Sequence, residues 1–169
     1  FHDRGWMFSK VLGIAVSGFA VFALGSFGIL SFTTSVCLGL VGALILVSWI
    51  FGCFKVRVHA PEIDFLMMEE VLFFAFFLLW TYLAGFHPEA HGTEKFMDYG
   101  FMKAIMRSTA VPAEDLWYSG SGINYYYGGQ FYAVFLTKIT FTDVKQTYHL
   151  MRTMVAAFAF VLPFSITYH

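Results

Sequence analysis

Residues 34–54 read TSVCLGLVGALILVSWIFGCF, a stretch that contains no charged residue. The hydrocarbon core of a bilayer needs about 20 apolar residues in a helix, so this stretch is long enough to cross it once. The rest of the chain has the same character, since 59% of its residues are hydrophobic, 12% are charged and the mean hydropathy is +0.69. This composition leaves too little polar surface for a water-soluble domain, and we predict an all-α integral membrane protein.

Four other apolar stretches qualify, or nearly qualify, as membrane spans. The prediction is a polytopic helix bundle in a single membrane domain over 1–169, with about five spans: roughly 9–30, 34–54, 65–86, 125–141 and 148–168. Glycines are frequent in the first two spans, and small residues let helix backbones approach closely within lipid. We therefore predict a closely packed helical hairpin, with a tight turn at 31–35.

Lysines and arginines near the ends of these spans predict the sidedness of the chain. With five spans, residues 1–8, 55–64 and 142–147 share one face, and residues 31–35 and 87–124 share the other. The first face has the larger set: Arg4, Lys10, Lys55, Arg57, Lys138, Lys145 and Arg152. The second face has Lys95, Lys103 and Arg107. Because positive residues are retained on the cytoplasmic side, we predict that the long loop 87–124 is extracytoplasmic.

The charge of the chain also excludes one class of partner. The net charge is −1 and no basic cluster stands out, so the phosphate neutralisation on which nucleic-acid binding depends is not provided. No short positive region leads into a cleavable apolar segment, and we expect no signal peptide. The immediate partner predicted for this chain is the lipid bilayer.

The predicted external loop gathers charge in the stretch HGTEKFMDYGFMKAIMRS, residues 91–108. Thr93 can cap a helix that runs from Glu94 to about Ser108, because a hydroxyl accepts hydrogen bonds from the free backbone N–H groups at a helix start. The apolar residues of this helix form one stripe: Phe101, Met102 and Ile105. A helix with such a stripe is expected to lie at the membrane surface.

Two carboxylates and two cations on this helix are candidate site residues. Glu94 and Asp98 stand one turn apart, with Asp98 nearer the apolar stripe, and either can serve as a general base or a metal ligand. Lys103 and Arg107 form a second pair that can hold a phosphate. Solvated charges on an interfacial helix explain the same spacing, so both interpretations stay open.

Polar and aromatic residues further along the loop are candidates for substrate binding. They are Trp117, Asn124, Tyr125, Tyr126 and Tyr127. Aromatic faces bind sugar rings, and they also form belts at the membrane interface. The two uses can coexist.

A divalent-metal site is conceivable at His87 and His91, which are four residues apart. Pro88 and Gly92 argue against the helix that this spacing would require. We therefore assign no metal ligand, and leave a divalent metal cofactor open.

The loop motifs together resemble those of an uncharacterised prokaryotic membrane-protein family called YYY. The matching residues are Gly92-Thr93-Glu94-Lys95-x-Met97-Asp98, Arg107-Ser108, Pro112 with Asp115 and Trp117, and Asn124-Tyr125-Tyr126-Tyr127. Asp3-x-Gly5 and Ser9-Lys10-x-x-Gly13 are similar to the start of that family's domain. The resemblance covers essentially the whole chain, and it identifies the chain as an N-terminal part of a longer member.

That family is grouped with the GT-C glycosyltransferases, and the resemblance implies their fold and chemistry. It implies a prokaryotic cytoplasmic-membrane enzyme that passes a sugar, with inversion, from a polyprenyl-phosphate carrier to an acceptor on the extracytoplasmic face. In such enzymes a carboxylate in an early external loop serves as base or metal ligand, which points to Glu94 and Asp98.

Two other functions stay open on the residues alone. One is a non-catalytic scaffold or assembly subunit of a larger complex, with other membrane subunits as partners. The other is a transporter, although no internal repeat or pair of broken helices is evident in the sequence.

Overall fold

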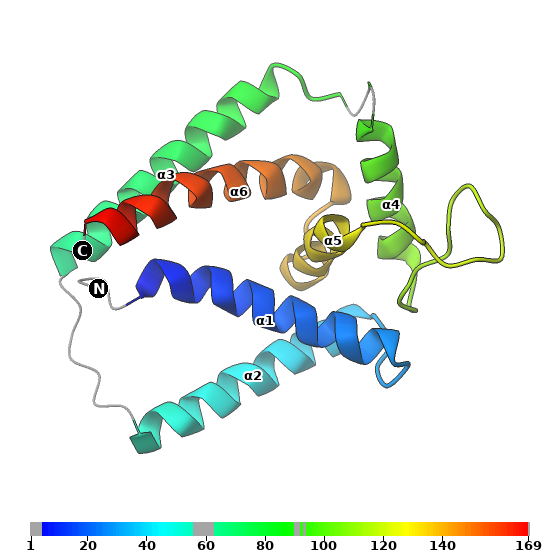
Figure 1. Cartoon of the computed structure of the whole chain (residues 1–169), viewed down its shortest axis with the longest axis horizontal. Helices are drawn as coiled ribbons and strands as arrows, with labels where there is room; N and C mark the ends of the chain where they lie inside the picture. Colours follow the sequence, from blue (N-terminus) through cyan, green and yellow to red (C-terminus); the bar gives the residue numbers. More distant parts are fainter. Residues whose placement is uncertain (1–4, 56–62, 90–91, 93, 169) are drawn as a thin grey trace.

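The computed structural model describes residues 5–55, 63–89, 92 and 94–168. This part of the chain is all-helical, as predicted, and has six helices (Figure 1). In chain order they are α1 (Trp6–Ser26), α2 (Thr34–Lys55), α3 (Ile63–Gly85), α4 (Lys95–Arg107), α5 (Gly128–Thr140) and α6 (Val144–Thr167). Glu114 and Gly122 in the α4–α5 segment form a single antiparallel bridge.

Three helices in the described part are long and apolar enough to cross a membrane: Trp6–Ser26, Thr34–Gly52 and Val144–Thr167. They leave large apolar side chains exposed, such as Ile45 and Trp49 of α2, which suits contact with lipid. The predicted count of five spans is not confirmed. α3 is of similar length, and carries three carboxylates within its first two turns: Asp64, Glu69 and Glu70.

The predicted span over 125–141 is a short core helix. α5 has 13 residues, which corresponds to about 20 Å and is less than the roughly 30 Å of a bilayer core. Its side chains are among the most buried in the described residues, with Phe131, Val134 and Phe135 at most 1% exposed. An apolar helix of this length is typical of a core helix, and the predicted span is not confirmed here.

Contacts of α5 and α6 also differ from the predicted grouping of the segments into two faces. Lys138, near the end of α5, donates a hydrogen bond from Nζ to the Phe32 carbonyl in the α1–α2 turn at 3.0 Å. His149, near the start of α6, lies 3.0 Å from the Pro88 carbonyl, just after α3. The end of α5 and the start of α6 therefore lie at the same end of the molecule as the α1–α2 turn and the segment after α3 (Figure 1). The prediction placed residues 142–147 on the opposite face.

This arrangement removes the charge difference from which an extracytoplasmic loop was predicted. Lys138, Lys145 and Arg152 move to the side of the loop. Four of the seven positive residues predicted for the first face are then left, against six on the side of the loop. The count of positive residues no longer favours either orientation clearly.

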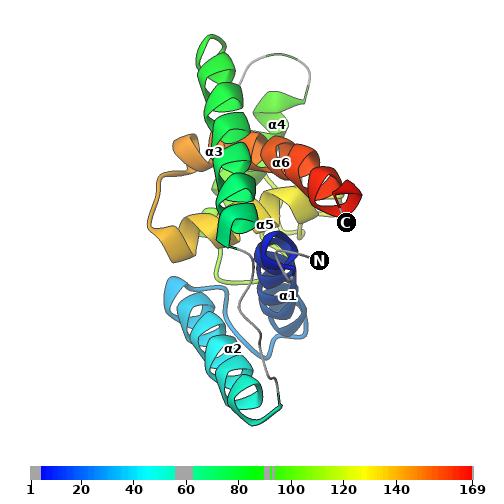
Figure 2. The ribbon, with the colours of Figure 1, turned by 90° about the vertical axis from the view of Figure 1, so that its left-hand side faces the viewer.

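α3 and α6 form the most extensive helix pair and run antiparallel to each other (Figures 1 and 2). The rings of Phe73 and Phe158 lie 4.7 Å apart. Further along the pair, the Thr81 and Thr153 hydroxyls are hydrogen-bonded at 3.1 Å. Aromatic packing and a polar contact thus fix the register of these two helices.

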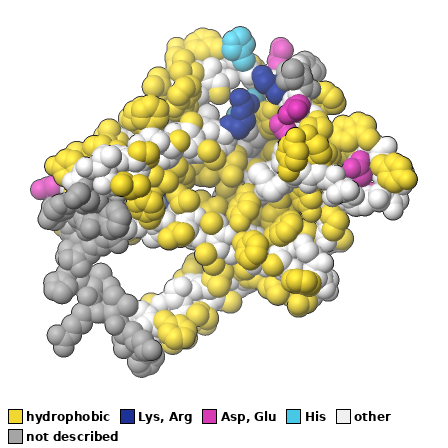
Figure 3. Space-filling model, in the orientation of Figure 1, with side chains coloured by type: hydrophobic (Ala, Val, Ile, Leu, Met, Phe, Trp, Pro, Cys, Tyr) yellow, Lys and Arg dark blue, Asp and Glu magenta, His cyan; other side chains and the backbone are white. Residues whose placement is uncertain are grey.

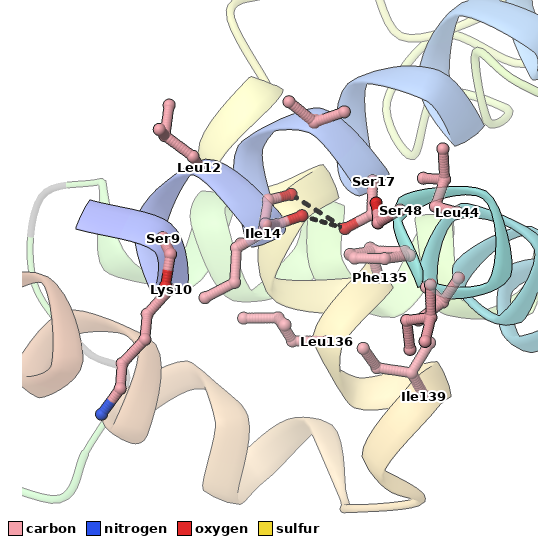
Figure 4. Close-up of a pocket in the computed structure, with 14 residues that line it drawn as sticks. Ser9, Lys10, Leu12, Ile14, Ser17, Leu44, Ser48, Phe135, Leu136 and Ile139 are labelled. Carbon is pink, nitrogen blue, oxygen red and sulfur yellow. Dashed lines mark hydrogen bonds between the residues drawn. The ribbon is translucent and has the colours of Figure 1, made fainter. Parts of the chain in front are cut away.

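The hairpin of α1 and α2 is not closely packed along its length, contrary to the prediction. A Cβ added at Gly13, Gly39 or Gly42 would meet nothing within 4 Å. An apolar cavity of ≈ 640 Å³ lies between α1, α2 and α5, and Figure 4 shows side chains of all three helices around it. The Ser17 hydroxyl donates to the Gly13 carbonyl of its own helix, so it adds little polarity to this wall.

Two other glycines of α1 explain where small residues are required. A Cβ at Gly18 would lie 2.3 Å from the ring of Tyr132, whose hydroxyl donates to the Ala15 carbonyl at 2.8 Å. A Cβ at Gly25 would lie 2.9 Å from Val111 in the α4–α5 segment. The glycines of α1 thus permit the approach of α5 and the loop, and not of α2.

The larger hydrophobic core lies at the end of the molecule formed by α4 and α5. Phe131 of α5 stacks on Phe32 of the α1–α2 turn, with ring centroids 4.8 Å apart. Met102 and Ile105 of α4 belong to the same core. This packing holds α4, which carries the predicted site, against α5 and α6.

Candidate functional site

The helix predicted over 94–108 is present as α4, Lys95–Arg107. Its apolar stripe is buried as expected, with Phe101, Met102 and Ile105 in the core. Thr93, the predicted cap, lies outside the described residues. Glu94 occupies the N-cap position and makes no side-chain cap hydrogen bond. α4 therefore presents Asp98 from its first turn.

Asp98 lies where α4, α5 and α6 meet. Its Oδ1 accepts a hydrogen bond from Gln130 Nε2 of α5 at 2.6 Å. No other hydrogen bond to this carboxylate is found among the described residues. Asp98 is half-buried and lines a cavity of ≈ 350 Å³. The other lining residues are Met102, Gly129, Gln130, Ala133, Tyr148, Met151, Arg152 and Val155.

Glu94 does not share this cavity. Its side chain is exposed at the start of α4, one turn away from Asp98. The two carboxylates nevertheless act on the same neighbour, Tyr125. The hydrogen bond to Tyr126 is the largest cause that raises the pKa of Tyr125 to about 12, followed by desolvation and the charge of Tyr126, and the negative charges of Glu94 and Asp98 add the smallest part. Of the two predicted catalytic residues, the structure places Asp98 in a cavity and Glu94 at the surface.

Three of the predicted substrate-binding residues come together in one exposed aromatic surface, formed by Trp117, Tyr125 and Tyr126. Phe101 links them, with its ring 5.4 Å from Trp117 and 5.9 Å from Tyr125. The rings of Tyr125 and Tyr126 stack at 4.0 Å, and their hydroxyls are hydrogen-bonded at 2.7 Å. Trp117 is 57% and Tyr126 78% exposed, so their faces are open to a ligand or to the membrane interface.

Asn124 and Tyr127 are the two remaining candidates of this segment, and neither belongs to the aromatic surface. Tyr127 is half-buried, with its ring 6.2 Å from that of Phe22 on α1, and burial raises its pKa. Asn124 is exposed. Of the three consecutive tyrosines, Tyr125 and Tyr126 therefore lie at the surface, and Tyr127 packs against α1.

The predicted phosphate-binding residues are not brought to Asp98. Lys103 lies over the ring of Tyr99, with Nζ 5.5 Å from the ring centroid. Arg107 is exposed near the end of α4 and lines a different cavity of ≈ 300 Å³, together with Glu114 and Asp115. It stands nine residues after Asp98, or about 13 Å along the helix.

Sequence reasoning missed Arg152 and Gln130. Arg152 lines the Asp98 cavity and also a neighbouring cavity of ≈ 460 Å³ between α3, α4 and α6. We call this neighbouring space the basic cavity, after the basic residues that line it: His87, Lys95, His149 and Arg152. Figure 3 shows Lys, Arg and His side chains gathered at this end of the molecule. The signal available in the sequence was a pair of basic residues, His149 and Arg152, one turn apart at the start of an apolar run.

The described residues do not define a metal site. Within the described part of the chain, no group of three or more His, Cys, Asp or Glu side chains is arranged to hold a metal ion. His87 is exposed after the end of α3, and His91 lies outside the described residues. The structure therefore does not test a metal at His87 and His91, where no ligand was assigned from the sequence, and a divalent metal cofactor stays open.

The helices and their outward apolar surfaces define the chain as a helical membrane protein. A comparison with protein families is consistent with this class. The family described as "Uncharacterized membrane protein (DUF2298)" matches residues 16–169, and the chain belongs to that family. Neither the curated proteins nor the solved structures contained a match. The function must therefore be inferred from the site itself.

Proposed function

We propose that this protein is a GT-C-like glycosyltransferase, which moves a sugar from a polyprenyl-phosphate carrier to an acceptor. The observation that carries the proposal is the half-buried Asp98 carboxylate, which lines a cavity of ≈ 350 Å³ where α4, α5 and α6 meet. The resemblance of the loop motifs to the YYY family supplies the reaction class.

Asp98 is the proposed general base. The acceptor hydroxyl gives its proton to the carboxylate while its oxygen attacks the anomeric carbon of the sugar. The bond from that carbon to the carrier phosphate breaks, and the phosphate leaves with the electron pair. A positioned base contributes roughly 10²–10⁴-fold to such a rate. Gln130 holds Oδ1 in place, which leaves the second carboxylate oxygen for the acceptor.

The lining of the cavity suits a substrate with an apolar carrier. Met102, Met151 and Val155 form its apolar part. Met151 and Val155 belong to α6, which is a candidate membrane span. A carrier chain in the bilayer could therefore reach this cavity while its phosphate stays at the polar boundary. The aromatic surface at Trp117, Tyr125 and Tyr126 supports the proposal, because exposed rings can stack on a sugar.

We also propose that α4 and the aromatic surface face the extracytoplasmic side, on the basis of the family resemblance. Ser121 is exposed and suits a test. A cysteine at this position, after replacement of Cys37 and Cys53, should react with a membrane-impermeant thiol reagent in intact cells. Reaction only after permeabilisation would place the loop in the cytoplasm.

The catalytic proposal is tested on the purified full-length protein by measuring sugar transfer from polyprenyl-phosphate-linked donors, with and without added divalent cation. Turnover together with co-purified lipid-linked phosphate, found by mass spectrometry, would support it. A scaffold subunit would instead give no turnover, carry no such lipid and fill the Asp98 cavity with another subunit. Turnover that disappears with a chelator would assign a metal to the reaction.

A further inference from the structure

The basic cavity has the charge of an anion-binding site. Its volume is ≈ 460 Å³, and its described charged or titratable lining residues are all basic: His87, Lys95, His149 and Arg152. They come from three separate parts of the fold, namely the end of α3, the start of α4 and the start of α6. Side chains that are distant in the sequence thus converge around one space, and the positive charges of Lys95 and Arg152 favour an anion.

Two contacts hold the α6 side of this cavity in place. Nε2 of His149 donates to the Pro88 carbonyl at 3.0 Å, since a carbonyl oxygen can only accept. The Arg152 guanidinium lies over the ring of Tyr148, with Cζ 5.4 Å from its centroid. A ligand would therefore meet side chains that are already oriented, which lowers the entropy lost on binding.

The basic cavity also has an apolar side. Trp80, Leu83 and Ala156 line it beside the basic residues. Trp80 and Leu83 belong to α3, and Ala156 belongs to α6, the candidate span that pairs with α3. An anion with an attached hydrocarbon chain would satisfy both sides, whereas a free anion would leave the apolar side in contact with water.

We propose that the basic cavity binds the phosphate of a lipid, through Arg152 and Lys95 with His87 and His149 beside them. Arg152 lines both this cavity and the Asp98 cavity. A lipid phosphate held here therefore lies next to the proposed base, and a sugar attached to that phosphate would extend toward Asp98. The identification of this lipid as the sugar donor rests on the proposed function, whereas the binding of a lipid phosphate does not.

The test is direct binding of farnesyl phosphate to the full-length protein in phosphatidylcholine nanodiscs. Arg152→Gln and Lys95→Gln are each expected to weaken binding about tenfold or more, because each removes a charge-assisted hydrogen bond to phosphate. Lys103→Gln and Arg107→Gln are matched controls, since they remove the same charge from α4 outside the cavity, and should stay within about threefold of wild type. Farnesol tests the need for phosphate, and inorganic phosphate tests the need for the chain.

Each outcome decides the proposal. Equal weakening by all four variants would indicate diffuse attraction and overturn the site. Equal affinity for farnesol would remove the phosphate from the inference, and equal affinity for inorganic phosphate would replace the lipid by a free anion. Thermal unfolding of each variant excludes misfolding as the cause, and His87→Gln gives an independent, exposed position to test. Sugar transfer is measured alongside lipid binding. If neither the wild type nor any variant transfers sugar, while the wild type and Asp98→Asn bind the lipid equally, the glycosyltransferase proposal is rejected and the lipid-phosphate site is retained.

Discussion

Two carboxylates at opposite ends of the molecule show how different environments assign different roles to the same chemical group. Glu70 on α3 pairs with Lys10 of α1, and its Oε1 also accepts from Trp6 Nε1 at 2.5 Å. Asp98 on α4 accepts from the neutral amide of Gln130 and lines a cavity. Lys10 thus compensates the charge of Glu70 within the fold, whereas Gln130 orients the Asp98 carboxylate without neutralising it.

This difference assigns a structural role to Glu70 and a chemical role to Asp98. An ion pair between two helices stabilises their contact, and a removed partner leaves the other charge without compensation. A carboxylate held by an amide at a cavity keeps an oxygen for an incoming hydroxyl. Substitutions at the two positions should therefore affect different measurements.

The largest effect is expected from Asp98→Asn. If Asp98 is the base, sugar transfer should fall by about a hundredfold or more, because an amide cannot take the proton. The unfolding temperature should change little, since an amide can still hydrogen-bond to Gln130. The measurement is turnover of the purified full-length protein, with Glu94→Gln as the control at the exposed neighbouring carboxylate. A loss of less than threefold in Asp98→Asn would remove it from the mechanism.

Next in size is the effect of Glu70→Gln on stability. The substitution leaves Lys10 without its anionic partner and weakens the contact between α1 and α3, which should lower the free energy of unfolding by about 1.5 kcal/mol. Thermal unfolding in detergent measures the change, and lipid binding to the basic cavity should be retained. If Glu70→Gln abolished transfer without loss of stability, the two carboxylates would not divide their roles as described.

A smaller effect on rate is expected from Gln130→Ala. The substitution removes the donor to Asp98 Oδ1, and the freed carboxylate should rotate away from its productive position. We expect a loss of about tenfold in turnover, which corresponds to one charge-assisted hydrogen bond. Gln130→Glu is a stricter variant, because it replaces the donor with a like charge and should reduce turnover further. Unchanged turnover in both would show that Asp98 needs no positioning partner.

The smallest effect concerns the titration of Tyr125, whose pKa is raised to about 12 mainly by the hydrogen bond to Tyr126, with a minor part from the Glu94 and Asp98 carboxylates. Asp98→Asn should lower this pKa slightly because it removes a negative charge, and Glu70→Gln at the other end should leave it unchanged. Since the folded state holds this proton more tightly than the unfolded state, the contribution to stability is complete below pH 10 and is lost as the pH rises toward 12. Absorbance titration measures the pKa, with Tyr125→Phe to identify the signal. An equal shift in both variants would contradict the local origin of the effect.

The sequence allowed most helices to be predicted, because runs of apolar residues such as 34–54 leave few alternatives. It also predicted α4 to within one residue at each end. It could not separate α5 from a membrane span, since the apolar run over 125–141 is close to the length of a short span, whereas the helix within it has only 13 residues. The decisive contact, from Lys138 to the Phe32 carbonyl, joins residues that are 106 positions apart. No local pattern predicts such a contact.

The candidate site could be predicted only in part, because local sequence patterns show some of its residues and long-range contacts bring in the others. The charged and aromatic residues of the loop itself indicated Asp98, Trp117 and the tyrosines. Arg152 was assigned to the opposite face, because the predicted span over 125–141 reverses the side of every later residue. Lys103 and Arg107 were chosen because they share a helix with Asp98, yet helix geometry places Arg107 about 13 Å along the axis.

The uneven environment of the glycines in α1 and α2 has a consequence for saturation mutagenesis. At Gly13, Gly39 and Gly42 the space around the backbone is open, so a scan of all side chains should return a broad spectrum of tolerated apolar residues. At Gly18 the ring of Tyr132 is held by its hydrogen bond to Ala15, and alanine should already be selected against. A profile of tolerance along α1 would thus record, residue by residue, where the helix packs against protein and where the space beside it is open.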